Sequence, residues 1–202
     1  MTQKVGIVDY GIAGNILNIA KALENAQANI QILKGPSEFK NVSKLVIPGV
    51  GSFSDGMKEL KESGMTEEIL KFATSQKPVL GICLGMQILA SIGFEYGETE
   101  GLKLVRGEVR PMRCKHVVPH MGFNTLRIIG KSPLFEKVDE VSSYYFMHSF
   151  EFINYTDIIA LTEYSGYEFV SAVQHNNIFG VQFHPEKSRE AGIQVFKNFL
   201  NI

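Results

Sequence analysis

Short apolar runs alternate with amphipathic stretches through the first half of the chain. The amphipathic segment 15–28 carries apolar residues at the i, i+3, i+4 and i+7 spacing of one helix face, beginning at Ile16. The apolar runs between such segments predict buried strands. The expected strands are 4–9, 30–33, 44–47 and 79–83. Helices are expected over 15–28 and 84–90. Between them we expect a short helix through Met57 and Leu60 that ends near Gly64, and a second helix that Thr66 caps. Repeated alternation of strand and helix predicts a parallel sheet covered on both faces.

The second half of the chain has a different pattern. From residue 102 to 183, short strand-like runs follow one another with turns between them and little helical periodicity. Ser188 is expected to cap a final helix whose apolar stripe begins at Ile193. We therefore predict one α/β domain over 1–202, with a central, mostly parallel sheet and antiparallel additions in the C-terminal half. The expected additional strands are 103–110, 116–118, 125–129, 144–150, 158–161, 169–175 and 178–183.

Composition narrows the class of protein. The chain has 202 residues, of which 45% are hydrophobic and 20% are charged, and its formal net charge is −1, which fits a compact globular protein with a full core. No block of lysine and arginine provides the basic surface that nucleic-acid binding requires. No apolar run approaches the roughly 20 residues of a membrane span, and the first residues lead directly into a strand instead of an export signal.

The cysteines and histidines indicate a reducing compartment and no metal. Only Cys83 and Cys114 are present, 31 positions apart, which matches neither a zinc site nor a disulfide framework. The histidines form no dense ligand set with these cysteines, so we expect neither a metal nor a cofactor. Together with the composition, this predicts a cytoplasmic protein that binds neither nucleic acid nor a membrane.

The segment GICLGMQ (81–87) places Cys83 where a strand changes into a helix, with a glycine two residues before it and another two residues after it. This is the pattern of a nucleophile elbow with cysteine in place of serine, in which the sharp turn strains the backbone and the glycines avoid collisions with neighbouring elements. The positive end of a helix that begins at Leu84 favours the thiolate. Taken alone, Cys83 fits a small buried core cysteine equally well.

The segment FGVQFHPEKS (179–188) ends a buried strand on His184 and Glu186, with a proline between them. In extended backbone, positions i and i+2 point the same way, so both side chains are expected on one side of the strand exit. The carboxylate can then hold the imidazole while its other nitrogen faces a thiol, as nucleophile, base and orienter. A satisfied structural histidine explains His184 alone. An elbow cysteine and a strand-end His-x-Glu in one α/β chain favour a joint catalytic function.

The glycine turn PGVGSF (48–53) adds a third element to this hypothesis. A glycine turn after a parallel strand exposes backbone N–H groups, and one near Val50 or Gly51 can combine with the N–H of Leu84 to stabilise an oxyanion. Taken alone, the same sequence also fits an ordinary strand-to-helix turn.

Together, GICLGMQ and GVQFHPEKS resemble the class I, triad-type glutamine amidotransferases. Within that family, the segments PGVGSF, VPHMGFN (118–124), YYFMHS (144–149) and DYGIAGN (9–15) resemble the glutaminase subunits of imidazole glycerol phosphate synthase, which belongs to histidine biosynthesis. The resemblance covers essentially the whole chain, from Val5 to the last helix. It implies a flavodoxin-like, three-layer fold and no cofactor.

The resemblance implies a glutaminase that acts on L-glutamine. The Cys83 thiolate would attack the side-chain amide of glutamine. His184 would deliver a proton to the departing ammonia and then activate water against the glutamyl thioester, while Glu186 would hold His184. The family's oxyanion loop aligns with residues 48–52, where a peptide must often reorient before the oxyanion hole forms. The residues implied in glutamine selection are Gln87, the backbone near Gly51, and Glu95.

The resemblance also implies a heterodimer with a partner subunit. This partner would be a (β/α)8 barrel cyclase that receives the ammonia through a tunnel and makes imidazole glycerol phosphate and an aminoimidazole carboxamide ribotide. The positions that match partner-facing residues of the family are Asn15, Asn18, Tyr145 and Lys187. Lys187 could pair with an acidic residue of the cyclase, whereas a solvated surface lysine explains it without the resemblance.

One position departs from the family pattern. The family often has tryptophan where this chain has Phe123, and the chain contains no tryptophan. Phenylalanine keeps the aromatic packing but loses the indole N–H donor. The departure keeps open a second hypothesis, a paralogue that supplies ammonia to a sugar-modifying amidotransferase pathway. A third is a non-catalytic amidotransferase-like binding scaffold, but such a protein would be expected to have lost Cys83 or His184.

Overall fold

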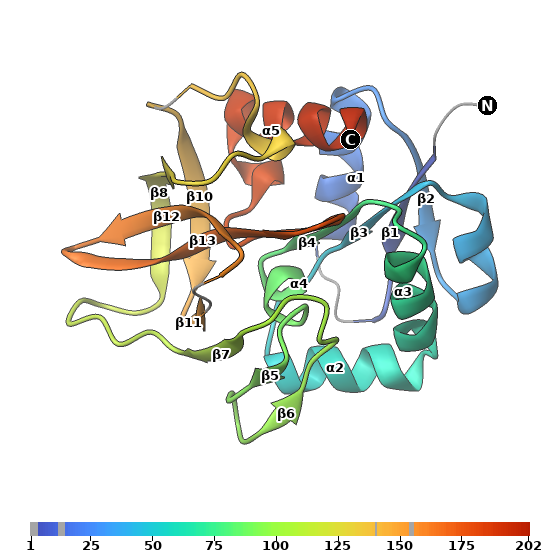
Figure 1. Cartoon of the computed structure of the whole chain (residues 1–202), viewed down its shortest axis with the longest axis horizontal. Coiled ribbons are helices and arrows are strands. Elements are labelled where there is room, and N and C mark those ends of the chain that lie inside the picture. The colour runs from blue at the N-terminus through green and yellow to red at the C-terminus, as the bar shows by residue number, and fades with distance from the viewer. Residues whose placement is uncertain (1–3, 12–14, 140, 154–155) are drawn as a thin grey trace.

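A large mixed sheet forms the centre of the computed structural model, which describes residues 4–11, 15–139, 141–153 and 156–202 (Figure 1). Its parallel half contains, in order, β2 (Asn29–Leu33), β1 (Lys4–Val8), β3 (Lys44–Ile47), β4 (Val79–Ile82) and β14 (Ile178–Val181). Every pairing between neighbours in this group is parallel. The pairing of β14 with β4 brings their C-terminal ends side by side, and Cys83 and His184 follow these two ends.

Antiparallel strands extend the sheet beyond β14, as predicted for the C-terminal half. The order continues through β13 (Tyr167–His175), β11 (Phe150–Ile153), β7 (Glu108–Pro111), β5 (Ile92–Gly93) and β6 (Thr99–Glu100), while β12 (Ile158–Tyr164) pairs with β13 and with β9 (Arg127–Ile128). The β5–β7 pair is parallel, and the other pairs in this part are antiparallel.

The strands expected at 144–150 and at 116–118 differ in the structure. Residues 144–148 do not join the large sheet, because β10 (Ser143–His148) pairs with β8 (His120–Thr125) in a separate two-stranded antiparallel sheet. The strand expected at 116–118 is wrong, and these residues form a loop. Both valines of this run are exposed to solvent, so its apolar side chains do not face the core that a buried strand would require.

The helix expected over 84–90 is shorter than predicted. α4 spans Leu84–Gln87, and the carbonyl groups of residues 88–90 accept hydrogen bonds from the backbone of residues 102–105. These contacts satisfy carbonyl groups that the end of the predicted helix would have left without an internal donor. They also hold the beginning of the expected strand 103–110 outside the sheet, so that only its end forms β7.

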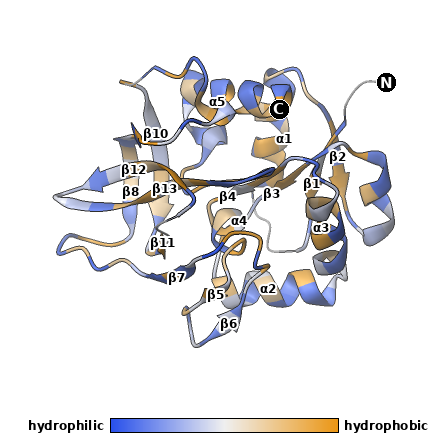
Figure 2. Cartoon of the chain, viewed as in Figure 1, coloured by the Kyte–Doolittle hydropathy of each residue, from blue (hydrophilic) through white to orange (hydrophobic). Residues whose placement is uncertain are grey.

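Helices cover both faces of the parallel half, as predicted (Figure 1). One face carries α1 (Ile16–Asn25) and α5 (Arg189–Asn201). The other face carries α2 (Phe53–Glu62) and α3 (Met65–Thr74). In β1, Val5 and Ile7 pack into the core beneath α1 and α5, whereas Val8 packs into the opposite core. Figure 2 shows the apolar strands of this half between helices that carry hydrophilic residues.

Two helix caps differ from expectation. Thr66 lies inside the first turn of α3, because the helix begins earlier, after Gly64 with a left-handed φ of 72°. Ser188 occupies the N-cap position of α5, but its side chain makes no capping hydrogen bond.

Short 3₁₀ helices are η1 (Pro36–Asn41), η2 (Pro133–Phe135) and η3 (Pro185–Lys187). Within the described ranges, no helix has the length and apolar character that crossing a membrane requires.

Candidate active site

Cys83 occupies a strained turn between β4 and α4. Its backbone has φ 54° and ψ −111°, a combination that residues with a side chain rarely adopt. A Cβ atom on Gly85 would lie 1.8 Å from the carbonyl oxygen of Ile47, and one on Gly81 would lie 2.5 Å from the carbonyl oxygen of Gly85. Glycine is therefore required on both sides of the cysteine, for the reason that the nucleophile-elbow pattern predicts.

His184 and Glu186 reach each other across a turn. β14 ends at Val181 and η3 begins at Pro185, so the expectation of extended backbone through Glu186 is wrong. The two side chains nevertheless meet: His184 Nδ1 lies 2.8 Å from Glu186 Oε1, and both side chains are buried. The turn is held by α5, in which a Cβ atom on Gly192 would lie 1.8 Å from the carbonyl oxygen of Pro185.

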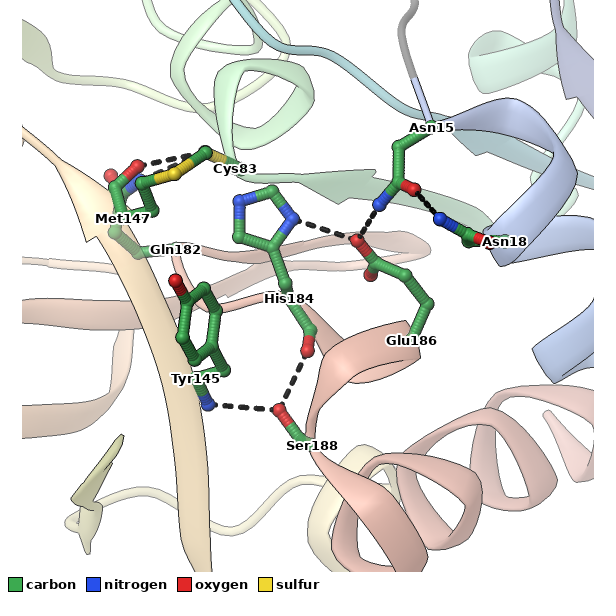
Figure 3. A network of polar contacts seen from close by, with 9 residues as sticks. All are labelled: Asn15, Asn18, Cys83, Tyr145, Met147, Gln182, His184, Glu186 and Ser188. Atoms are coloured by element: carbon green, nitrogen blue, oxygen red, sulfur yellow. Dashed lines mark hydrogen bonds and ion pairs between the residues drawn. The ribbon is translucent and has the colours of Figure 1, made fainter. Parts of the chain in front are cut away.

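Two asparagines extend this pair to the start of α1. Asn15 Nδ2 donates to Glu186 Oε1, and Asn18 Nδ2 donates to Asn15 Oδ1 (Figure 3). Asn15 therefore contacts the same carboxylate oxygen as the imidazole. Sequence reasoning expected both asparagines to face a partner and missed this role behind Glu186, because nothing in the spacing indicates that α1 lies against η3.

The protonation of His184 depends on both of its neighbours. Burial of the ring opposes its positive charge, but the Cys83 sulfur and, after it, the Glu186 carboxylate outweigh burial and raise the pKa of His184 to about 10. Figure 3 shows the second ring nitrogen, Nε2, on the side that faces Cys83. The raised pKa of His184 favours an imidazolium beside the Cys83 sulfur.

Ser188 fixes the backbone of the histidine. Its hydroxyl donates to the carbonyl oxygen of His184 at 2.6 Å and accepts from the N–H of Tyr145 at 3.0 Å. The N–H of His184 in turn donates to the carbonyl oxygen of Tyr145 at 2.8 Å. The serine expected as a helix cap therefore ties His184 to β10.

A cavity of about 190 Å³ lies beside Cys83. Its wall includes most of the residues predicted to bind the oxyanion or glutamine, namely Gly51, Leu84, Gln87 and Glu95. Val50, which was also predicted, is not part of this wall. Pro119 and residues 147–150 form the rest. The Cys83 side chain makes no capping hydrogen bond to α4, and the first residue of this helix, Leu84, lines the cavity.

Tyr10 anchors the beginning of the glycine turn, and sequence reasoning missed it. Its hydroxyl donates to the carbonyl oxygen of Pro48 at 2.6 Å. Burial and, after it, the charge of Cys83 raise the pKa of Tyr10, so the hydroxyl keeps the proton that it donates. Gly49 packs against this hydroxyl, since a Cβ atom there would lie 2.6 Å from it.

Glu95 anchors the other end of the turn. Its Oε2 accepts from the N–H of Phe53, the first residue of α2, at 2.8 Å. Burial raises the pKa of Glu95, although the Phe53 N–H acts in the opposite direction. Between the two anchors Gly51 has a left-handed φ of 98° and is exposed. The glycine turn is therefore held at both ends, with a glycine in left-handed conformation between the two anchors.

Gln182 lies between the cavity and the sulfur. Its Nε2 lies 3.7 Å from Cys83 Sγ, and its Oε1 accepts from Gln87 Nε2 at 3.0 Å. Sequence reasoning missed this residue. Gln182 precedes His184 by two positions, so the same alternation that paired His184 with Glu186 could have placed it on the same side of the strand exit.

Two other buried histidines are His148, which lines the cavity, and His120, which contacts it. His148 Nδ1 lies 2.8 Å from the carbonyl oxygen of Phe150, and His148 Nε2 lies 3.3 Å from His120 Nδ1. The carbonyl oxygen can only accept, so His148 carries its proton on Nδ1 and accepts from His120 on Nε2. Burial lowers the pKa of His148 to about 3 and that of His120 to about 4. Both are neutral at neutral pH, unlike His184.

Aromatic and cationic side chains form a rim beside His184, consisting of Phe123, Tyr145, Lys187 and Arg189. The Phe123 and Tyr145 rings lie 5.5 Å apart, edge to face. The Lys187 ammonium lies 5.3 Å from the centre of the Tyr145 ring, and the Arg189 guanidinium lies 4.9 Å from that of Phe123. Phe123 is 46% exposed, so this rim presents an aromatic surface to solvent.

The chain is similar to known proteins over nearly its whole length. The family model described as glutamine amidotransferase class-I matches residues 7–202. The chain is 43% identical over 205 residues to the imidazole glycerol phosphate synthase subunit HisH of Wolinella succinogenes, with 98% of this chain and 99% of that protein covered. It is 44% identical over 202 residues to the subunit of the same name from Sulfurimonas denitrificans, with 96% of each chain covered.

Solved structures with low sequence identity share the fold. The structure of PurLQS from Thermotoga maritima matches with a TM-score of 0.80 and 20% identity, covering 100% of this chain and 99% of that one. A crystal structure of a glutamine amidotransferase matches with a TM-score of 0.76 and 17% identity, covering 98% of this chain and 99% of that one. These likenesses concern the fold alone, and they confirm the predicted flavodoxin-like α/β architecture.

Proposed function

Because the chain belongs to the class-I glutamine amidotransferase family, in the group of the imidazole glycerol phosphate synthase subunits HisH, we propose that it hydrolyses L-glutamine and delivers the ammonia to a partner subunit. In this proposal residues 1–202 act as one amidotransferase domain. The partner is a (β/α)8 barrel cyclase of histidine biosynthesis, which uses the ammonia to make imidazole glycerol phosphate and an aminoimidazole carboxamide ribotide.

The observation that carries the proposal is the arrangement at the ends of β4 and β14. A cysteine in a strained elbow faces the imidazole of His184, whose opposite nitrogen is bonded to a buried carboxylate. This order of groups supports Cys83 as nucleophile, His184 as general base and acid, and Glu186 as orienter.

The first half of the reaction forms a thioester. The Cys83 thiolate attacks the side-chain carbonyl carbon of glutamine, and the oxygen that becomes negative accepts hydrogen bonds from the N–H groups of Leu84 and of Val50 or Gly51. The C–N bond then breaks, and the imidazolium of His184 gives its proton to the leaving nitrogen, which departs as ammonia. Gly51 supports this role because its backbone conformation and exposure leave the peptide free to turn.

The second half releases glutamate. Neutral His184 takes a proton from water, the hydroxide attacks the thioester carbonyl, and the C–S bond breaks to restore the Cys83 thiolate. Glu186 keeps the imidazole in the tautomer that presents Nε2 to the reacting groups, since its carboxylate accepts from Nδ1.

Gln87 and Glu95 are proposed to select glutamine. The Gln87 NH2 group donates to the carbonyl oxygen of Phe150 and to Gln182, so Oε1 is left to accept from the α-ammonium group of the substrate. Glu95 adds a carboxylate to the same cavity wall, where it can also bind an ammonium group. The dimensions of the cavity admit only a small ligand.

The rim of Phe123, Tyr145, Lys187 and Arg189 is proposed as part of the surface that meets the cyclase. It combines exposed aromatic area with two cations, and aromatic and arginine side chains are common at interfaces. Tyr145 connects it to the base through the backbone bond to His184. Asn15 and Asn18 are proposed as a second contact region, since they reach the Glu186 carboxylate.

The proposal is tested with a glutamine analogue that carries a diazoketone in place of the side-chain amide. Incubation of the chain with the L-enantiomer is expected to add one equivalent of label to the peptide that contains Cys83, as read by mass spectrometry, because only a thiolate held in a glutamine site reacts in this way. Excess L-glutamine should block the label. Labelling of Cys114 instead, or equal labelling by the D-enantiomer, would contradict a glutamine-specific site at Cys83.

The identity of the partner decides between two pathways. The second candidate partner is a cyclase-like protein of a sugar-modifying pathway. It is considered because the exposed rim carries Phe123, where the family often has tryptophan. Co-purification from the native cells followed by mass spectrometry identifies the partner. Stimulation of glutamine hydrolysis by a phosphoribulosyl-formimino ligand of that partner supports histidine biosynthesis, and stimulation only by a sugar-nucleotide ligand would assign the chain to the other pathway.

A further inference from the structure

The direction in which Gln182 presents its amide follows from a chain of hydrogen bonds that begins at a backbone carbonyl. The Phe150 oxygen can only accept, so the group of Gln87 that lies 3.1 Å from it is the NH2 group. The same NH2 group lies 3.0 Å from the Gln182 side chain, which must therefore present its oxygen to Gln87. The Gln182 NH2 group is left facing Cys83 Sγ, at 3.7 Å.

A further neighbour of the sulfur, besides Gln182 and His184, does not favour the thiolate. Cys83 Sγ lies 3.9 Å from the carbonyl oxygen of Met147, which accepts from a neutral thiol but repels a negative sulfur. An N–H group donates to both forms and more strongly to the charged one. Gln182 is fully buried, so its amide is shielded from solvent.

From this arrangement we propose that Gln182 is a positioning residue, which donates an amide N–H to the Cys83 sulfur, stabilises its thiolate and fixes its direction. The contribution is separate from that of His184, because it does not depend on the charge of the imidazole. The inference rests on the proposed function in taking Cys83 as the nucleophile.

The test measures the alkylation rate of Cys83 by iodoacetamide as a function of pH, since alkylation requires the thiolate. All measurements use the full chain with Cys114→Ser, so that one cysteine reacts. Gln182→Met keeps the length of the side chain but removes the donor. We expect its pH midpoint to rise by roughly one unit, with roughly tenfold slower alkylation below the midpoint.

Gln182→Glu removes the N–H donor while keeping nearly the same side-chain shape, so it tests the donor alone. The glutamate keeps an oxygen for Gln87 Nε2 but turns a second oxygen toward the sulfur. The resulting repulsion is expected to raise the midpoint at least as far as in Gln182→Met. If Gln182→Met does not fold, as judged by circular dichroism and gel filtration, this variant alone carries the test.

Asn198→Leu is the matched control for loss of a buried amide. Asn198 is buried in α5, and its Nδ2 donates to the carbonyl oxygens of Leu134 and Glu136, far from the cavity lining. Its substitution is expected to lower the free energy of unfolding without moving the alkylation midpoint. If Gln182 had only a structural role, its variants would likewise lower the free energy of unfolding without moving the alkylation midpoint.

Unchanged midpoints in Gln182→Met and Gln182→Glu would overturn the inference, and so would a shift of the same size in Asn198→Leu. Alkylation does not require turnover of glutamine. Failure of the chain to hydrolyse glutamine even with its partner and the partner's ligand therefore contradicts the proposed function, while the midpoint shift still reports whether Gln182 stabilises the thiolate.

Discussion

At the scale of single residues, the carbonyl oxygen of Phe150 sets the hydrogen-bonding roles of two side chains around the cavity. It accepts from Gln87 Nε2 and also lies 2.8 Å from His148 Nδ1. Because this oxygen has no proton to donate, each partner must present an N–H group to it. The direction of the Gln87 amide and the tautomer of His148 therefore have a common origin.

Lowering the pH is expected to destabilise the fold through His148. Its pKa is about 3 in the folded chain, against an ordinary value of 6.5, so below pH 6.5 the unfolded chain binds a proton that the folded chain does not. Stability is thus lost as the pH falls from 6.5 toward 3, by on the order of 1–2 kcal/mol at pH 5. The measurement is the free energy of unfolding in urea at pH 7 and pH 5.

His148→Gln is the comparison for this prediction, because it keeps a donor for Phe150 but cannot titrate. Its loss of stability between pH 7 and pH 5 should be smaller than that of the unchanged chain. His184 acts at the other end of the pH scale, since its raised pKa gives a contribution that is complete below about pH 6.5 and is lost as the pH rises through about 10. Equal losses in both proteins would show that His148 is not the cause.

Sequence reasoning found the residues whose chemical type and spacing are themselves unusual. Cys83 between glycines, and His184 with Glu186 after a strand, indicate a site from their pattern along the chain alone. Gln182 and Ser188 were missed because their roles depend on neighbours that are distant along the chain: Gln182 meets Cys83 and Gln87, and Ser188 meets β10. Spacing along one segment can place Gln182 on the same side as His184, but it does not identify these distant partners.

At the scale of elements, the position of the turn that carries His184 and Glu186 depends on how closely α5 approaches η3. Gly192 makes this approach possible, since a Cβ atom there would lie 1.8 Å from the Pro185 oxygen. The helix itself was predictable from its apolar stripe. The close approach was not, because it involves a backbone oxygen of another element and leaves no trace in the hydropathy pattern.

Gly192→Ala is expected to lower kcat for glutamine hydrolysis by at least about tenfold, because η3 must move and carries Glu186 with it. The free energy of unfolding should fall by roughly 1–3 kcal/mol. Steady-state kinetics and urea unfolding measure the two effects. Gly35→Ala is the matched control, since a Cβ atom there meets nothing within 4 Å, and it should change neither quantity. Full activity in Gly192→Ala would contradict the proposed coupling between α5 and the site.

The differences between expected and observed elements share a physical cause. α4 ends early, and much of 103–110 stays out of the sheet, because these two segments satisfy each other's backbone groups. α3 begins early because Gly64 adopts a left-handed conformation. In each case a backbone interaction or conformation outweighed the local preference of the side chains, and propensity alone cannot predict such an outcome.

At the scale of the whole molecule, the site forms where two neighbouring parallel strands end. β4 and β14 are far apart along the chain, yet their pairing brings Cys83 and His184 to the same edge of the sheet. Ligands of open α/β sheets bind at the carboxyl ends of the strands, and the cavity beside Cys83 follows this rule. The sequence predicted both strands, but it did not predict that they are neighbours.

The isolated chain is expected to hydrolyse glutamine weakly, and the partner with its ligand should raise kcat strongly, because ammonia made without an acceptor is wasted. Ammonia release is measured with and without the partner. Substitution of Lys187 by methionine should reduce the stimulation, since it removes a cation from the rim, and Lys197→Met on α5 serves as the control. High hydrolysis by the chain alone, unchanged by the partner, would contradict the coupling.

The central claim is that this chain breaks the side-chain amide of glutamine with the sulfur of Cys83. The most direct measurement is ammonia and glutamate release by the complex of chain and partner, with Cys83→Ala compared against Cys114→Ala. We expect Cys83→Ala to fold normally and to release no ammonia above background, whereas Cys114→Ala remains active. Full glutamine hydrolysis by a folded Cys83→Ala chain would contradict it.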